Sequence, residues 1–268
     1  MHFPAIFTAC LLLANLSTTF VSSTNEIEVE DEHPFTYEEN TEKGPEHWGD
    51  LNPNWRVCDT GNFQSPIDLR HEKVELLSGL GQLRRTYKPA LAVVRNRGHD
   101  IMVQWKGDAG GIIINETRYN LIQCHWHTPS EHRVDGKSFN MELHMVHNNS
   151  QGQIAVVGIL YALGRPDTFL TKLLSNITSL NDEEGNELGV VNPWEIKFGS
   201  RKYYRYIGSL TVPPCTEGVI WTLLTKVRTV SREQLRALRD AVDDGFEENA
   251  RPTQSLDGRS VYMYHPEL

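Results

Sequence analysis

The amino-acid sequence predicts a mainly β fold of the α+β class, with short helices added to a sheet. Short runs of alternating or continuous apolar residues recur along the chain, and turns rich in Gly, Pro and Asn separate them. Two further segments combine a helix-start signal with helical apolar spacing. Because no internal repeat or linker interrupts this pattern, we expect residues 24–268 to form a single domain.

The expected strands follow one another with short connections. In chain order they are residues 101–105, 111–115, 121–127, 140–147, 153–163, 203–207 and 218–222. Side chains alternate between the faces of a strand, so residues 121–127 and 140–147 each have an apolar and a polar face. The apolar faces suit a packed core, and the polar faces suit the floor of a cavity.

The two expected helices are marked by their caps. Asp167 can accept from the first backbone N–H groups of a helix with Phe169, Leu170, Leu173, Leu174 and Ile177 on one side. The stretch 231–234 reads as a capping box, in which Ser231 and Gln234 satisfy each other's backbone N–H groups. The apolar residues Leu235, Leu238 and Val242 follow it.

Composition and charge exclude some classes of partner. At 268 residues, 39% hydrophobic and 23% charged, the chain is globular and long enough to bury a sizeable core. Its net charge of −9 and its lack of a basic run exclude nucleic acid as an expected partner. Nothing in the sequence predicts an oligomeric state.

Residues 1–23 are predicted to be a secretory signal peptide. An apolar stretch at 5–13 is followed by small residues at 21–23 that suit cleavage. An uncleaved anchor is the alternative, but polar residues interrupt the run before it reaches a spanning length, and no later segment reaches it. Entry into the secretory pathway makes the sequons at Asn115, Asn148 and Asn176 glycosylation candidates.

Three histidines form the outline of a catalytic zinc site. His125 and His127 share the polar face of one expected strand, and His144 lies on the polar face of the next. Three imidazoles leave a fourth zinc position open, as catalytic sites do. Solvated histidines on a polar face are the alternative reading. Gln123 and Glu142, on the same faces, favour metal because a zinc-bound imidazole needs an acceptor for its outer N–H.

Several motifs in a fixed order resemble the α-class carbonic anhydrases, and more narrowly their secreted plant members. They are GPEHWGDLNPNWRVC (44–58), QSPIDL (64–69), RNRGHD (95–100), the histidine block, GSLTVPPCTEGVIW (208–221) and NARP (249–252). The resemblance implies a large, mostly antiparallel twisted sheet with peripheral short helices, a zinc cofactor, and reversible hydration of carbon dioxide to bicarbonate and a proton. It also implies an extracellular (apoplast) location, or an organelle reached through the secretory pathway.

The resemblance assigns roles to residues that would otherwise read as turn or surface positions. Zinc lowers the pKa of its bound water to about 7, which supplies hydroxide for attack. Thr211 and Glu131 match the pair that orients the hydroxide, and His99 matches the histidine that shuttles the proton. The backbone carbonyl of Asn249 matches the acceptor for His127.

A small apolar substrate calls for an apolar wall beside the metal. By resemblance, Val146, Val156, Leu210 and Trp221 form that wall. Val212 stands where many family members carry threonine. We expect this difference to alter the handling of anions and esters more than hydration.

Cysteine usage agrees with an oxidising compartment. Loss of Cys10 with the signal peptide leaves Cys58, Cys124 and Cys215, an odd number that allows one bridge and one free thiol. Secreted relatives join the positions of Cys58 and Cys215, which both lie in loop-like sequence here. The alternation places Cys124 in the core, where we expect a buried free thiol.

Two other functions compete with this reading. A storage or carbohydrate-binding protein could use the same fold, and metal content would distinguish it from the enzyme. A zinc hydrolase acting on esters would be distinguished by comparing hydration with ester cleavage. No nucleophile elbow or Ser/His/Asp arrangement supports a serine hydrolase.

Overall fold

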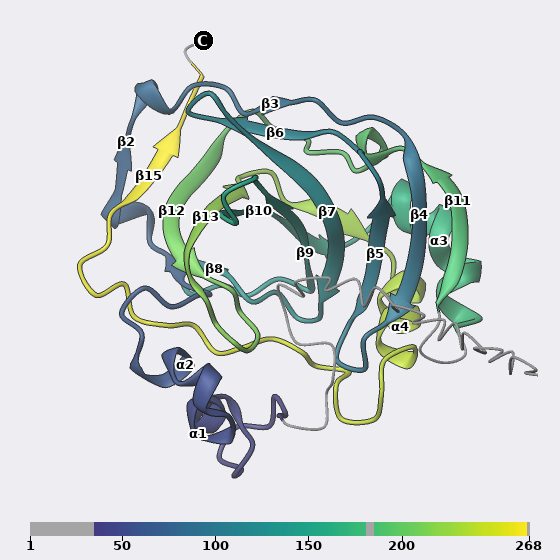
Figure 1. Cartoon of the computed structure of the whole chain (residues 1–268), viewed down its shortest axis with the longest axis horizontal. Coiled ribbons are helices and arrows are strands. Elements are labelled where there is room, and N and C mark those ends of the chain that lie inside the picture. The colour runs from purple at the N-terminus through teal and green to yellow at the C-terminus, as the bar shows by residue number, and fades with distance from the viewer. Residues whose placement is uncertain (1–34, 181–184, 267–268) are drawn as a thin grey trace, which may run out of the picture.

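The computed structural model describes residues 35–180 and 185–266. One large, strongly twisted sheet dominates this part of the chain, and short helices lie around it (Figure 1). The signal peptide predicted for residues 1–23 lies outside the described residues. No described helix is long and apolar enough to cross a membrane.

The sheet has 13 strands, most of which pair antiparallel. Its main path runs β11-β4-β5-β7-β9-β10-β13-β12-β15-β2. The bounds are β2 Val74–Leu76, β4 Ala90–Asn96, β5 Ile101–Lys106, β7 Thr117–His127, β9 Met141–Asn148, β10 Ile154–Leu163, β11 Asn186–Val191, β12 Tyr203–Ser209, β13 Glu217–Leu224 and β15 Val261–Tyr264. Parallel pairs join β10 to β13 and β15 to β2. The predicted fold class is therefore confirmed.

Shorter strands complete the architecture. β3 (Arg84–Arg85) and β6 (Gly111–Ile114) extend the sheet beside β7, and β14 (Arg228–Val230) pairs parallel with β10. A separate two-stranded sheet joins β1 (Asp68–Leu69) to β8 (Arg133–Val134). Near the amino end of the described chain, α1 (Trp48–Leu51) and α2 (Val57–Thr60) form a small helical layer below the sheet (Figure 1).

The two faces of the sheet bury different clusters. The larger cluster contains Cys124, Trp126, Leu143 and Met145, and the helices α3 (Thr168–Thr178) and α4 (Arg232–Asp240) pack on it. The alternate residues of the same strands, including His125 and His144, face the opposite side. Because a strand has a period of two, one face is mostly apolar while the other can carry polar chemistry.

Both predicted helix starts are confirmed. The Asp167 side chain accepts from the N–H groups of Phe169 and Leu170, and Ser231 and Gln234 form the reciprocal capping box. α4 ends at Asp240, so Val242 lies beyond the helix and not on it. Val242 nevertheless packs against the larger cluster.

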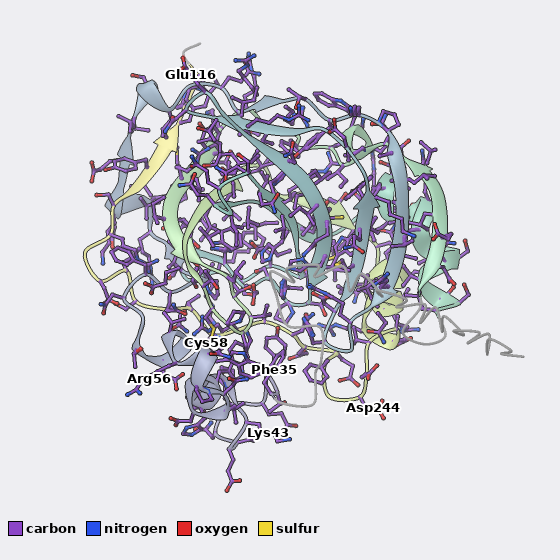
Figure 2. All side chains as sticks on the ribbon, viewed as in Figure 1. Phe35, Lys43, Arg56, Cys58, Glu116 and Asp244 are labelled. Atoms are coloured by element: carbon purple, nitrogen blue, oxygen red, sulfur yellow. A yellow bond between two sulfur atoms is a disulfide. The ribbon has the colours of Figure 1, made fainter. Side chains whose placement is uncertain are left out.

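The predicted disulfide is also present. Cys58 in α2 is bonded to Cys215, and Cys124 is a buried free cysteine. Figure 2 labels Cys58 within the small helical layer. Both cysteines belong to a buried cluster with Phe35, Trp48 and Val212. The bond therefore ties this layer to the loop that follows Thr211.

Removing the bridge is expected to lower the free energy of unfolding. The bonded residues are 157 positions apart, and the chain-entropy model gives about 5 kcal/mol for so long a loop, with typical measured values of about 2–4 kcal/mol. We expect a loss in the measured range for the double variant Cys58→Ser/Cys215→Ser in denaturant unfolding. Cys124→Ala is the matched control, because it removes the free thiol and keeps the bridge. Finding Cys124 in the bridge by non-reducing peptide mapping would contradict this assignment.

Candidate metal centre

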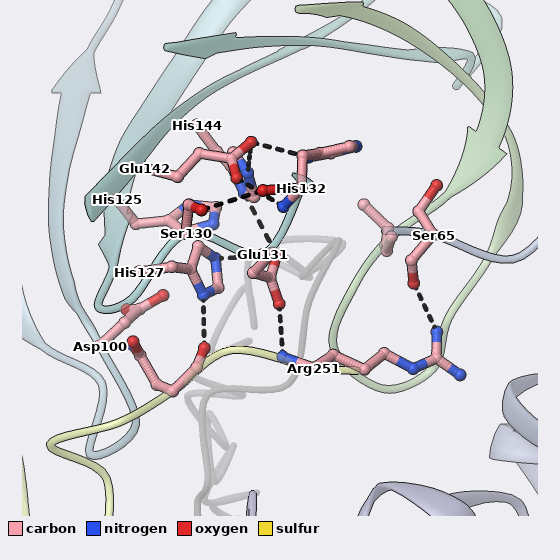
Figure 3. A network of polar contacts seen from close by, with 12 residues as sticks. Ser65, Asp100, His125, His127, Ser130, Glu131, His132, Glu142, His144 and Arg251 are labelled. Carbon is pink, nitrogen blue, oxygen red and sulfur yellow. Dashed lines mark hydrogen bonds and ion pairs between the residues drawn. The ribbon is translucent and has the colours of Figure 1, made fainter. Parts of the chain in front are cut away.

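The three histidines converge on one point of the sheet. The pairing of β7 with β9 places His125 directly opposite His144, and His127 follows on the same face. The ring centroids are 4.6–5.2 Å apart, and one ligand atom from each ring lies within 4.8 Å of the others. All three side chains are buried. Figure 3 shows them gathered beside Glu131.

Each imidazole has one nitrogen held by an oxygen acceptor. His125 Nδ1 donates to Gln123 Oε1 at 2.9 Å, and His127 Nδ1 donates to the Asn249 carbonyl at 2.7 Å. His144 Nε2 donates to a Glu142 oxygen at 2.9 Å. A neutral imidazole that donates from one nitrogen carries a lone pair on the other. The acceptors therefore set the tautomers that a metal ion requires.

The buried Nε2 of His127 is available as a ligand atom for a metal ion. Within the described residues it has no hydrogen-bond partner, although buried polar atoms are normally satisfied. Nitrogen ligands in this number are typical of catalytic zinc sites. The residues present therefore fit zinc.

A hydrogen-bonded chain holds Glu142 behind the ligand His144. Glu142 accepts from the backbone N–H and from Nδ1 of His132, at 2.8 and 2.7 Å. His132 Nε2 and the Tyr206 hydroxyl are 2.7 Å apart, and that hydroxyl is 2.8 Å from Ser65 Oγ. Burial alone would raise the pKa of Glu142, but His132 and His144 hold it well below its usual range. A charged Glu142 keeps His144 oriented.

Glu131 faces the metal side of the histidines. Its Oε1 accepts from the backbone N–H of Arg251 at 3.0 Å, and its Oε2 lies 3.5 Å from His127 Nε2 and 3.9 Å from His144 Nδ1. Burial raises the pKa of Glu131 to about 7, although His127 and the side chain of Thr211 lower it in part. The structure thus brings Glu131 and Thr211 together next to the three ligands.

His99 lies at this site but is buried. Its ring centroid is 5.5 Å from that of Phe35, and within the described chain neither ring nitrogen has a hydrogen-bond partner. Burial lowers the pKa of His99 to about 4, although Asp100 acts in the opposite direction. Its carbonyl accepts from Asn249 Nδ2 at 2.8 Å. The same asparagine therefore links His99 to the ligand His127.

The apolar residues expected beside the metal separate into two groups. Val146, Val156, Leu210 and Trp221 share one buried cluster, and the Trp221 ring centroid lies 4.8 Å from that of His144. Val212 instead belongs to the cluster around the disulfide. Four of the five residues named from the sequence thus share one cluster, and Trp221 of that cluster lies against His144.

The supporting role of Arg251 is visible only in the structure. Besides its backbone contact with Glu131, its guanidinium donates to Gln64 Oε1 and to the carbonyls of Ser65 and Cys58 at 2.8–2.9 Å. These contacts join segments far apart in the chain. In the sequence, only the NARP motif pointed to Arg251, and that motif does not reveal the hydrogen-bond partners of the arginine.

The three sequons differ in exposure. Asn115 is exposed in the turn between β6 and β7, Asn148 is half-buried at the end of β9, and Asn176 is half-buried in α3. Among the three, the turn at Asn115 offers the most open acceptor.

Known proteins resemble this chain in sequence and in structure. Residues 43–265 match the family described as eukaryotic-type carbonic anhydrase. Alpha carbonic anhydrase 4 of Arabidopsis thaliana is 60% identical over 241 residues, which is 90% of each chain. Alpha carbonic anhydrase 7 of the same plant is 51% identical over 242 residues, covering 89% of this chain and 88% of that one.

Solved structures share the fold. Dioscorin complexed with ascorbate superposes with a TM-score of 0.84 at 43% identity, covering 86% of this chain and 97% of dioscorin. A hyperthermostable carbonic anhydrase from a hydrothermal vent chimney superposes with a TM-score of 0.79 at 32% identity, covering 86% of this chain and all of the other. With the family match and the similarity to the Arabidopsis enzymes, the chain belongs to the eukaryotic-type carbonic anhydrase family, as an α-class enzyme.

Proposed function

We propose that this enzyme catalyses the reversible hydration of carbon dioxide to bicarbonate and a proton, with one zinc ion held by His125, His127 and His144. The observation that carries this proposal is the convergence of three buried imidazoles, each with its outer nitrogen occupied by an acceptor. Zinc bound there would lower the pKa of a water molecule to about 7 and so supply a nucleophile at neutral pH.

Glu131 and Thr211 orient the attacking oxygen. Arg251 fixes one oxygen of the Glu131 carboxylate, so the other points toward the ligand nitrogens. A hydroxyl that donates to this carboxylate presents its own lone pairs as acceptors. Thr211 can therefore accept the hydrogen of the nucleophile and leave that nucleophile's lone pair aimed at the substrate.

The apolar wall positions carbon dioxide. Val146, Val156, Leu210 and Trp221 are each at most 2% exposed. A small, neutral and apolar molecule loses little on leaving water for such a wall, whereas bicarbonate loses much of its hydration. The wall thus favours entry of the substrate and release of the product.

His99 is the proposed proton relay, because each hydration releases a proton that must reach bulk solvent. Its linkage to Asn249 holds it next to the site, and its contact with Phe35 covers its ring. Transfer to solvent therefore requires the Phe35 or His99 side chain to move.

Replacing His99 by alanine is expected to lower maximal turnover in dilute buffer by about tenfold or more. The second-order constant for carbon dioxide should change little, because attack on the substrate does not use the relay. Stopped-flow hydration assays in a buffer titration measure both quantities. Small imidazole-type buffers should restore turnover, and exposed His47→Ala is the control. Unchanged turnover at low buffer would remove His99 from the mechanism.

The proposed reaction is tested by measuring zinc content and hydration on the same preparation. We expect one zinc per chain, hydration that is lost after chelation and restored by zinc, and ester cleavage far slower than hydration. Dominant ester cleavage would instead favour the hydrolase reading.

A second candidate is ligand binding without catalysis. The structural neighbour dioscorin was solved with ascorbate, which favours a binding role on this fold. Zinc content distinguishes the two functions. A binding protein without zinc would not catalyse hydration, whatever its affinity for ascorbate.

We also propose that the chain enters the secretory pathway and acts outside the cell or in an organelle on that route. The Cys58–Cys215 bridge supports an oxidising compartment, and residues 1–23 have the composition of a signal peptide. In that compartment Asn115, Asn148 and Asn176 are the candidate glycosylation sites.

A further inference from the structure

A cavity of about 430 Å³ lies away from the metal centre. It is lined by residues of β12, β13 and β15 and of the turn between β6 and β7, on the side of the sheet that also carries β2 (Figure 1). Figure 2 labels Glu116, next to Asn115 in that turn. The aliphatic and phenyl side chains that line the cavity are Phe63, Leu77, Leu80, Ile114, Ile207 and Ile220. Pockets of this size and character bind small molecules.

Large apolar side chains stand exposed around this cavity. Phe63, Leu77 and Ile207 are 44%, 40% and 46% exposed. Single exposed apolar residues are common, but a group around one hollow marks an interaction site. The cavity therefore has a hydrocarbon surface that a ligand could cover.

Arg205 places a positive charge in this cavity. Its side chain is 8% exposed, its Nε donates to Thr222 Oγ1 at 3.1 Å, and its guanidinium lies 5.0 Å from the Tyr203 ring. In residues 35–180 and 185–266, no carboxylate lies within ion-pair distance of Arg205. A buried charge without a counter-ion is costly. An anion bound in the cavity would offset that cost.

The second arginine of the lining, Arg259, is already held by the protein. Its guanidinium donates to the carbonyls of Ile207, Gln64 and Ser255. Its side chain therefore shapes the wall, and Arg205 is left as the cation for a ligand.

The Arg205 side of the cavity faces away from the metal centre, although Tyr206, which also lines the cavity, belongs to the hydrogen-bonded chain behind His144. Tyr204 and Tyr206 lie in the cluster with Trp221, next to the ligands, whereas Tyr203 lies in the larger cluster on the other face. By alternation, Arg205 and Ile207 share the face of Tyr203. A molecule paired with Arg205 would therefore leave the metal centre free.

We propose that this cavity binds a small organic monoanion, a carboxylate with an apolar body. The carboxylate pairs with the Arg205 guanidinium, whose planar fork of donors matches two carboxylate oxygens. The apolar body packs on Ile207, Ile220 and Leu77. Both parts are needed, since charge alone would leave the hydrocarbon wall uncovered.

The test is isothermal titration calorimetry of the zinc-loaded enzyme with 2-naphthoate and with the neutral 2-naphthamide. We expect the acid to bind about tenfold or more tightly than the amide, because a hydrogen bond to a charged group is stronger than one to a neutral group. Removal of zinc should leave this binding unchanged. Arg205→Gln should weaken it by a similar factor, and Arg236→Gln, on the exposed side of α4, should not.

Ile207→Glu provides a second variant at an exposed position, so the test does not depend on the folding of Arg205→Gln. Its carboxylate should repel the ligand and weaken binding to the level of the amide. The proposal is overturned by equal binding of acid and amide, by binding that is lost with zinc, or by unchanged affinity in Ile207→Glu. Binding that appears only after Asn115→Gln would assign the cavity to a glycan instead.

Discussion

Replacing His144 or His127 by alanine is expected to abolish zinc binding and carbon dioxide hydration while the protein stays folded. Each variant removes one of the three nitrogens that could hold a metal ion and leaves two. The fold should survive because the larger core lies on the opposite face of the sheet, and because Glu142 keeps its hydrogen bonds to His132 when His144 is lost. Metal analysis after zinc dialysis, circular dichroism and a hydration assay measure the three properties.

Two further variants distinguish the loss of a metal ligand from a general loss of folding. Gln123→Ala removes the acceptor of His125 but no ligand, and loss of such an acceptor typically lowers metal affinity by about 10–100-fold. His47→Ala, at an exposed position, should retain full zinc and activity. Zinc should also raise the melting temperature of the wild type and not that of His144→Ala, since a ligand stabilises only the state that binds it. A folded wild type that remains metal-free after zinc dialysis would falsify the assignment.

The alternation of two strands was enough to predict which residues converge. His125, His127 and His144 share a face because the period of a strand is two, and the observed pairing of β7 with β9 adds only the register. Gln123 and Glu142 follow from the same argument, because they lie two positions before a ligand. This part of the site is local in sequence, and local patterns are what a sequence shows directly.

Contacts between distant segments could not be predicted in this way. Arg251 reaches Glu131 and Cys58, and Tyr206 joins His132 to Ser65 across the sheet. His99 was expected to exchange protons with solvent, and its burial depends on Phe35, which lies in an earlier segment. Such contacts depend on the folded path of the chain, and a turn motif around His99 does not determine what packs on it.

Some strands lacked a sequence signal for a physical reason. β4 and β11 form one edge of the sheet, where Leu91 pairs with Val190 and both are more than half exposed. Apolar residues on the solvent side remove the alternation that marks a half-buried strand. β15 is short, and most of its residues are half-buried. The central strands were predicted because burial there follows the period-two pattern.

Replacing Thr211 by alanine is expected to lower hydration by about 100-fold or more, by analogy with the loss of one oriented transition-state contact. The variant keeps all three ligands, so zinc content should be unchanged. It removes the hydroxyl that we propose orients the attacking oxygen, and it leaves Glu131 without its side-chain interaction with Thr211. Thr211→Ser retains the hydroxyl and should keep most of the hydration activity. Val212 lies in the neighbouring cluster, and Val212→Thr should change anion binding or ester cleavage more than hydration. Steady-state hydration assays and zinc analysis of the variants test the role of the hydroxyl. Equal losses of hydration activity in Thr211→Ala and Thr211→Ser would assign the effect to packing and refute that role.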